Sequence, residues 1–224
     1  MCFSPEADLV AAVVIGAAGI DGLRHVTRRD QIPMALLPAT FALHQLDEVF
    51  VWLGLRGQVS PQVLHVTSWL YLIVAFGLLP VLAPLSVAAR DRGVRRRLLF
   101  GFVALGAVVA AALTYAVGRG PITTHIVRHH ISYRVVLGQG TIWVVLYVVA
   151  TCGAFLFSGH PHIRIFGVVN LVAVGLLAAL QRSAFISLWC AWAAITSIAL
   201  ALHFRHEHRS GTRSPQLVPE GVSG

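Results

Sequence analysis

The chain has 224 residues, of which 57% are hydrophobic and only 12% are charged, and its formal net charge is +8. Its mean hydropathy of +0.76 excludes an ordinary soluble domain, in which roughly a quarter of the residues are charged. The 17 basic residues are all arginines and most lie between apolar runs, so no continuous basic face remains for binding nucleic acid.

Seven apolar runs of the length that crosses a bilayer follow one another along the chain. They cover about residues 7–23, 33–55, 66–89, 98–117, 138–157, 165–180 and 184–204. The sequence therefore predicts an all-α integral membrane domain over residues 1–208, with seven transmembrane helices. Residues 209–224 are rich in Ser, Pro and Gly, a composition that predicts a disordered tail.

The arginines fall unevenly into two alternating sets of loops, and this asymmetry predicts the orientation in the membrane. The richer set comprises the first, third and fifth loops and the C-terminal tail, with Arg24, Arg28, Arg29, Arg90, Arg92, Arg95, Arg96, Arg97, Arg164, Arg205, Arg209 and Arg213. The poorer set holds Arg56, Arg119, Arg128, Arg134 and Arg182. Cytoplasmic loops carry the excess of basic residues. We therefore expect the N-terminus outside and the C-terminus in the cytoplasm.

The second apolar run contains the ionisable residues His44, Asp47 and Glu48, followed by Trp52. Charged groups at that depth are costly and face a bundle interior or a wet cavity. His44 and Glu48 are four residues apart, and Gln45, Glu48 and Trp52 also recur at helical spacing, so each set shares a helix face. This cluster is either a ligand, proton or metal site or a set of polar contacts that ties helices together.

The outer loop between the fourth and fifth runs contains His125, His129, His130 and Tyr133. If this segment is helical, His125 and His129 lie on one face, and imidazole is a common metal ligand. Removal of Met1 would leave Cys2 with a free amine and a thiol, a chelating pair. The alternative is that the histidines are only solvated at an interface and that the cysteine has no role.

Topology brings these groups to one outer end of the bundle, and the leading hypothesis is an outward-facing polar site that binds a transition metal. Zinc or copper suits such donors, and iron suits them less. The expected metal ligands are Cys2, His44, Glu48, His129 and His130, and the expected cavity lining is Gln45, Trp52 and Tyr133. In an enzyme, Glu48 would be the catalytic ligand or base for a metal-activated water that attacks a lipid-like or small hydrophobic substrate.

Two further classes stay open. One is a non-catalytic sensor or accessory subunit in which the polar cluster only packs helices. The other is a small proton or metal transporter that uses His44, Asp47 and Glu48 as a relay, although only Thr40 continues that path toward the cytoplasm.

Four stretches, MCFSPEAD (1–8), HQLDEVFVWLGL (44–55), RHHISY (128–133) and FISLWCAWAA (185–194), carry a family resemblance. The chain resembles an uncharacterised bacterial membrane family, abundant in actinobacteria, whose members begin Met-Cys-Phe-Ser. The resemblance implies several helical spans in a bacterial plasma membrane and supports Cys2, Gln45, Glu48, Trp52, His129, His130 and Tyr133 as characteristic positions. It implies no activity. The architecture is also similar to seven-span metal-dependent lipid hydrolases, but their paired histidines in the last span are not matched here.

Overall fold

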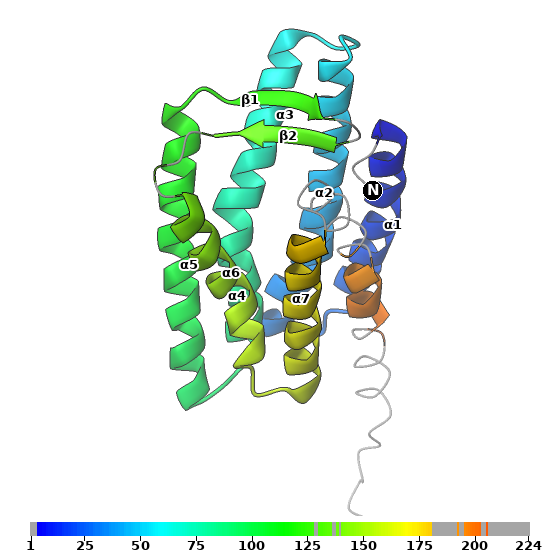
Figure 1. Cartoon of the computed structure of the whole chain (residues 1–224). Coiled ribbons are helices and arrows are strands. Elements are labelled where there is room, and N and C mark those ends of the chain that lie inside the picture. The colour runs from blue at the N-terminus through cyan, green and yellow to red at the C-terminus, as the bar shows by residue number, and fades with distance from the viewer. Residues whose placement is uncertain are drawn as a thin grey trace, which may run out of the picture.

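The computed structural model describes residues 4–127, 130–135, 138, 140–180, 192, 195–202 and 205, and for residues 130, 174 and 177–180 it describes the backbone alone. The described chain is mainly a bundle of antiparallel helices with one β-hairpin across its upper end (Figure 1). The elements are α1 (Pro5–Arg24), η1 (Arg29–Gln31), α2 (Ile32–Leu55), α3 (Pro61–Ile73), η2 (Val74–Leu78), α4 (Leu79–Ala88), α5 (Val94–Arg119), β1 (Thr123–Val127), β2 (His130–Arg134), α6 (Gly140–Leu156) and α7 (Pro161–Leu180).

The first six predicted apolar runs each coincide with a helix or helical series. Residues 192, 195–202 and 205 of the seventh run and its C-terminal flank are also helical. Two helices, Pro61–Ala88 and Val94–Arg119, are long and apolar enough to cross a membrane by length and composition. Gly140–Leu156 and Pro161–Ala173 are shorter apolar helices. The mainly helical class is confirmed, while the count of seven spans and their orientation stay predictions.

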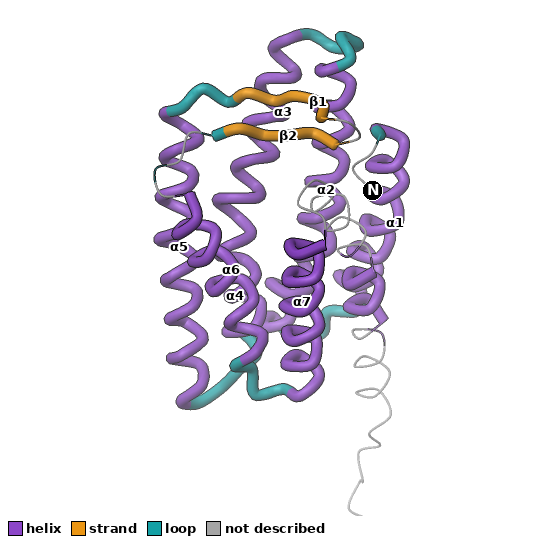
Figure 2. The backbone as a smooth tube through the Cα atoms, in the orientation of Figure 1, coloured by secondary structure: helices purple, strands orange, loops and turns teal. Residues whose placement is uncertain are grey.

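The third helix begins five residues before its predicted start because Ser60 caps it. The Ser60 hydroxyl accepts a hydrogen bond from the Val63 amide, and Pro61 occupies the first turn, where a missing N–H costs nothing. α3, η2 and α4 then form one continuous helix with a π-helical segment at Val74–Leu78 (Figure 2). The extra residue of a π-bulge disturbs the helical hydrogen-bond ladder. The Tyr147 hydroxyl of α6 donates to the Ala75 carbonyl in this segment at 3.0 Å.

Small residues allow two close helix contacts. A Cβ on Gly19 of α1 would lie 2.9 Å from the Ala39 amide nitrogen of α2, so α1 and α2 touch backbone to backbone. In α5, a Cβ on Gly106 would overlap the Pro80 carbonyl oxygen. That oxygen is the one the amide of residue 84 would normally bond, but Pro84 has no N–H. The Pro80 carbonyl therefore points at Gly106.

The loop between α5 and α6 forms a β-hairpin, so His125 lies in a strand and not in the helix considered for it, while His129 lies outside the described residues. β1 and β2 pair antiparallel, with Val127 opposite His130 and Thr123 opposite Arg134. Ile131 is fully buried against Val51 and Trp52. In β2 the apolar Ile131 and the aromatic Tyr133 alternate with polar residues and pack onto the helices, whereas Ile126 and Val127 of β1 are adjacent and exposed.

The lower end of the bundle is closed by the carboxylate of Asp91, in the turn between α4 and α5. Asp91 accepts hydrogen bonds from the Ser158 hydroxyl at 3.0 Å and from the Gly159 amide at 3.0 Å. It thereby fixes the turn that leads into α7. Arg205 donates two hydrogen bonds to Asp21, at 2.6 and 2.7 Å, and this raises the pKa of Arg205. The last helical segment is thus attached to α1.

Candidate functional site

One face of α2 turns four polar or aromatic side chains into the bundle. Glu48 is fully buried, Gln45 and Trp52 are 2% exposed, and His44 is 8% exposed. The lipophilic residues Leu43, Leu46 and Phe50 of the same helix lie on the exposed side. The burial expected from the helical spacing is therefore confirmed, because residues three, four and seven positions apart share a face.

A second acid from α1 joins this face. Asp8 is fully buried, and its carboxylate accepts a hydrogen bond of 3.0 Å from the indole nitrogen of Trp52. Above Trp52, the Arg56 guanidinium lies 5.4 Å from the ring centroid and pairs with Glu6 at 3.9 Å. Trp52 follows Glu48 by one helical turn, so Asp8 and Glu48 belong to the same upper region of the bundle.

Stacked rings form the other side of this region. The His44 ring lies 3.9 Å from that of Tyr71 on α3, and Tyr71 lies 4.4 Å from Tyr133 on β2. The two pairs are nearly parallel, with interplanar angles of 22° and 5°. The stack fixes the His44 ring, whose Nδ1 atom is buried and forms no hydrogen bond to a described residue.

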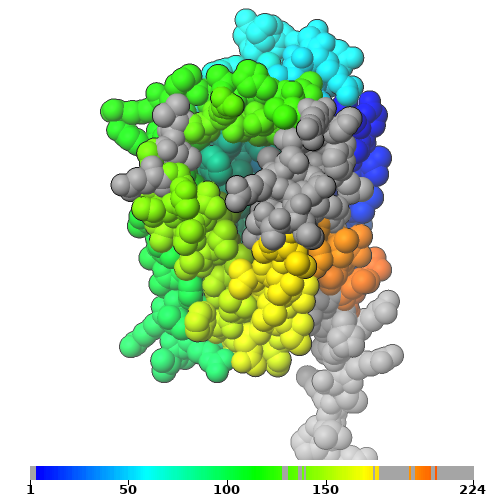
Figure 3. Space-filling model, in the orientation of Figure 1, coloured from blue at the N-terminus to red at the C-terminus, as the bar shows by residue number. Residues whose placement is uncertain are grey.

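The structure therefore brings together His44, Gln45, Glu48, Trp52 and Tyr133 where the upper half of α2 faces α3 and the hairpin. Figure 3 shows the hairpin crossing the upper part of this face of the molecule, below the turn between α2 and α3. Cys2 and His129 lie outside the described residues, as does the side chain of His130, whose backbone begins β2. Asp47, which the sequence offered as part of a relay, is half-buried.

A metal centre within the described residues alone is not present. No three His, Cys, Asp or Glu side chains among them are grouped closely enough to hold an ion. A complete ligand set would therefore have to include residues outside the described ones, such as the predicted ligands Cys2 and His129 or the side chain of His130, so the predicted metal site stays a prediction.

Two members of the cluster were missed from the sequence, Asp8 and Tyr71. Asp8 follows the N-cap Ser4 of α1 and reads as a first-turn acid that favours a helix start. Its full burial could nevertheless be expected from the sequence, because a charged acid inside an apolar run has a high desolvation cost unless it has a partner. Tyr71 is a polar aromatic residue within an apolar helix, and only its position opposite His44 gives it a role.

These features define a mainly helical bundle with a buried carboxylate, histidine and aromatic cluster toward one end. The chain belongs to the family of unknown function DUF6629, whose model matches residues 1–215. This confirms the resemblance to an uncharacterised family, while the bacterial source and the opening tetrapeptide stay expectations. No curated protein and no solved structure matches the chain.

Proposed function

We propose that this chain is a multi-pass plasma-membrane protein with seven spans, its N-terminus outside, and a transition-metal site at its outer end. The single observation that carries the metal site is the complete burial of two acids, Asp8 and Glu48, at the same end of the bundle.

Membrane insertion is supported by the exposed surfaces of the helices. Large apolar side chains point outward from five helices: Val13 (64% exposed), Leu43 (67%), Val108 (60%), Val144 (62%) and Ile165 (64%). Exposure of apolar surface to water costs about 25 cal/mol per Å². The same surfaces are well solvated by lipid, which accounts for an apolar exterior around a bundle that also has a packed interior.

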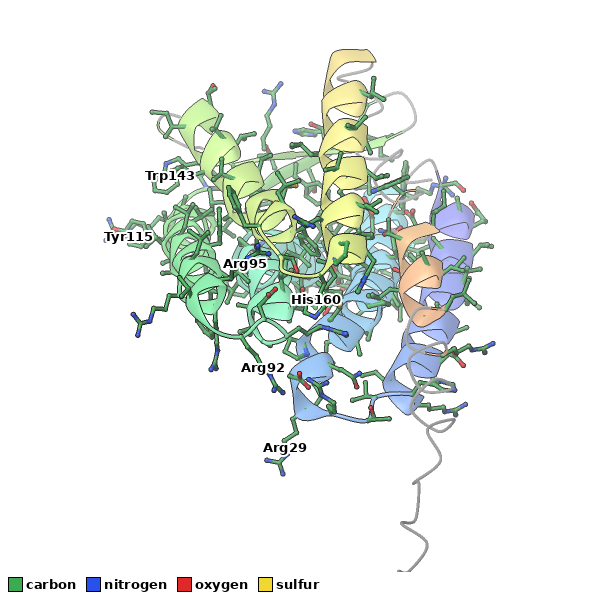
Figure 4. The ribbon with its side chains drawn as sticks, turned by 90° about the horizontal axis from the view of Figure 1, so that it is seen from below. Arg29, Arg92, Arg95, Tyr115, Trp143 and His160 are labelled. Atoms are coloured by element: carbon green, nitrogen blue, oxygen red, sulfur yellow. The ribbon has the colours of Figure 1, made fainter. Side chains whose placement is uncertain are left out.

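The ends of the bundle support the same location. Tyr115 lies four residues before the end of α5 and Trp143 three residues after the start of α6, and both project from the edge of the bundle (Figure 4). They lie within about 6 Å of the upper helix ends, the depth of an interfacial aromatic belt. At the lower end the described turns and helix starts carry arginines of the richer set, including Arg29, Arg92 and Arg95.

The metal site is supported by the charge that the upper cluster must accommodate. A buried carboxylate needs a proton, strong hydrogen bonds or a cation. One Asp8 carboxylate oxygen accepts a hydrogen bond from the Trp52 indole nitrogen. Ile131 packs the hairpin, whose sequence includes His129 and His130, against the same part of α2. Glu48, His129 and His130, with Cys2 and His44 as further donors, form a set that suits zinc or copper.

Such a metal would lower the pKa of a bound water and supply a nucleophile for hydrolysis. We propose Glu48 as a ligand or base, and Gln45, Trp52 and Tyr133 as the walls that orient a lipid-like substrate. A second candidate is a sensor or accessory subunit with a structural cluster. It is favoured by the Trp52–Asp8 hydrogen bond and the ring stack, which together connect α1, α2, α3 and β2.

Elemental analysis of the detergent-purified full chain tests the metal site. We expect about one equivalent of zinc or copper in the parent protein and in His65→Ala, whose histidine is exposed on α3. The metal should be lost in Glu48→Gln and in His129→Ala/His130→Ala, with unchanged monodispersity. Equal metal content in all four proteins, or none in the parent after reconstitution, would contradict the proposal.

A further inference from the structure

Two apolar cavities adjoin each other in the lower half of the bundle, away from the carboxylate cluster. The lower one, of about 170 Å³, lies between α2, α6, α7 and the helical segment 195–202. The upper one, of about 100 Å³, also reaches α4 and Trp192. Leu37, Phe155 and Phe166 line both cavities, which together are called the apolar path.

The polar groups along the upper cavity are already engaged within the protein. The Tyr147 hydroxyl donates to the Ala75 carbonyl, and the Thr151 hydroxyl donates to the Tyr147 carbonyl at 2.8 Å. Asn170 donates to the Phe166 carbonyl at 2.9 Å and accepts from the Trp192 indole at 2.6 Å. A polar ligand would have to displace these bonds, whereas an apolar chain would leave them intact.

The path starts at the arginine-rich end and extends inward along α7. His162, in the first turn of α7, lines the lower cavity, and Asn170 lines the upper one. Eight residues of helix separate them, a depth of about 12 Å. Figure 4 places His160, Arg95, Arg92 and Arg29 around this end of the bundle. The lower cavity, with His162 in its lining, thus lies at the end of the bundle that carries these basic side chains.

We propose that these cavities receive one acyl chain of an anionic phospholipid, with its phosphate near His162 and the arginine-rich end. Basic pockets between helices on the cytoplasmic side favour anionic head groups. Apolar side chains such as Met34, Ile163 and Leu200 complete the lining of the lower cavity and supply the contacts for the chain. The proposal rests on the membrane location argued above and is independent of the outer metal site.

Native mass spectrometry of the delipidated full chain in detergent tests this assignment, with dioleoyl phosphatidylglycerol and dioleoyl phosphatidylcholine as probes. We expect one tightly bound phosphatidylglycerol, held at least fivefold more tightly than phosphatidylcholine. Ala199→Trp fills the lower cavity and should reduce binding of both lipids at least tenfold. Val172→Trp, on the exposed side of α7, is the matched control and should bind like the parent. Ala83→Phe fills the upper cavity and replaces Ala199→Trp if that variant does not fold.

The head-group contact has its own pair of variants. His162→Ala should reduce the preference for phosphatidylglycerol severalfold, whereas His65→Ala at the opposite end should not. Unchanged lipid binding in folded cavity-filled variants would overturn the acyl-chain site, and equal affinity for both lipids would overturn the anionic preference. Displacement of the lipid by millimolar inorganic phosphate would indicate a phosphate site without a chain. Membrane fractionation and metal content, measured on the same preparations, separate failure of this site from failure of the proposed function.

Discussion

Trp52 is the residue on which the upper cluster depends most directly, because its indole connects α2 to the buried Asp8 of α1. Its ring also packs against Val51 and Ile131 and lies below the Arg56 guanidinium. One side chain therefore joins two helices, the hairpin and the surface charge above them. Its loss should affect stability before it affects anything else.

We predict that Trp52→Phe lowers the free energy of unfolding by about 1–3 kcal/mol, because it removes the indole N–H that donates to the buried carboxylate of Asp8. Trp69→Phe is the control, because Trp69 is 42% exposed on α3 and should change stability by less than about 0.5 kcal/mol. Thermal unfolding in detergent measures both. Equal midpoints for the two variants would contradict the role given to the Trp52–Asp8 bond.

For single residues, the sequence predicts the polar face of α2 but not the side chains of other elements that contact it. His44, Gln45, Glu48 and Trp52 follow from helical spacing, since an apolar run with acids must hide them. The burial of Asp8 could be expected from the apolar run that contains it, but its contact with Trp52 could not, and Tyr71 carries no such signal. Each becomes part of the cluster only through packing between elements that lie far apart in the chain, and no local spacing encodes that contact.

Among the elements, the helix from Pro61 to Ala88 and its neighbour α5 fit together through Gly106 and the Pro80 carbonyl. Pro80 and Pro84 interrupt the hydrogen-bond ladder of the helix from Pro61 to Ala88, and the π-helical segment Val74–Leu78 lies immediately before them. The Pro80 carbonyl has no amide partner within its helix, because Pro84 lacks an N–H, and it packs against Gly106 instead. A side chain at this position has no room.

We predict that Gly106→Ala destabilises the protein by about 1–3 kcal/mol, because the added methyl group overlaps backbone that cannot rotate away. Gly101→Ala, also in α5, has open space around it and should stabilise the helix by up to about 1 kcal/mol. Chemical unfolding of both variants checks the opposite signs. If Gly101→Ala destabilised the protein as much as Gly106→Ala, the loss would come from alanine in α5 in general and not from the contact between Gly106 and Pro80.

Six of the predicted apolar runs correspond to helices because their length and composition dominate local preference, but two elements were described incorrectly from sequence. The start of α3 lies at Pro61, where a Ser-Pro cap outweighs the polar residues that follow. The β-hairpin was treated as a loop or helix. Its strands are short, and their stability comes from Ile131 and Tyr133 packing onto α2 and α3.

The whole molecule has two different ends, with the hairpin at one and the arginine-rich turns at the other (Figure 1). In the proposed orientation, reporters fused at the C-terminus should be cytoplasmic. We therefore expect a fluorescent-protein fusion to be bright and an alkaline phosphatase fusion to be inactive, with the full chain in the carbonate-resistant membrane fraction. An active phosphatase fusion would reverse the orientation, and extraction by carbonate would contradict membrane insertion.

The proposed metal site around the buried acids at the upper end of the bundle is tested by metal-dependent thermal unfolding of the full chain. A metal that binds only the folded protein stabilises it by about 2.7 kcal/mol at a hundredfold excess over Kd. We predict that zinc or copper raises the unfolding midpoint, that a chelator lowers it, and that Glu48→Gln stays folded but responds to neither. A midpoint that no metal or chelator moves in the parent, together with a less stable Glu48→Gln, would contradict the metal site and identify a structural cluster.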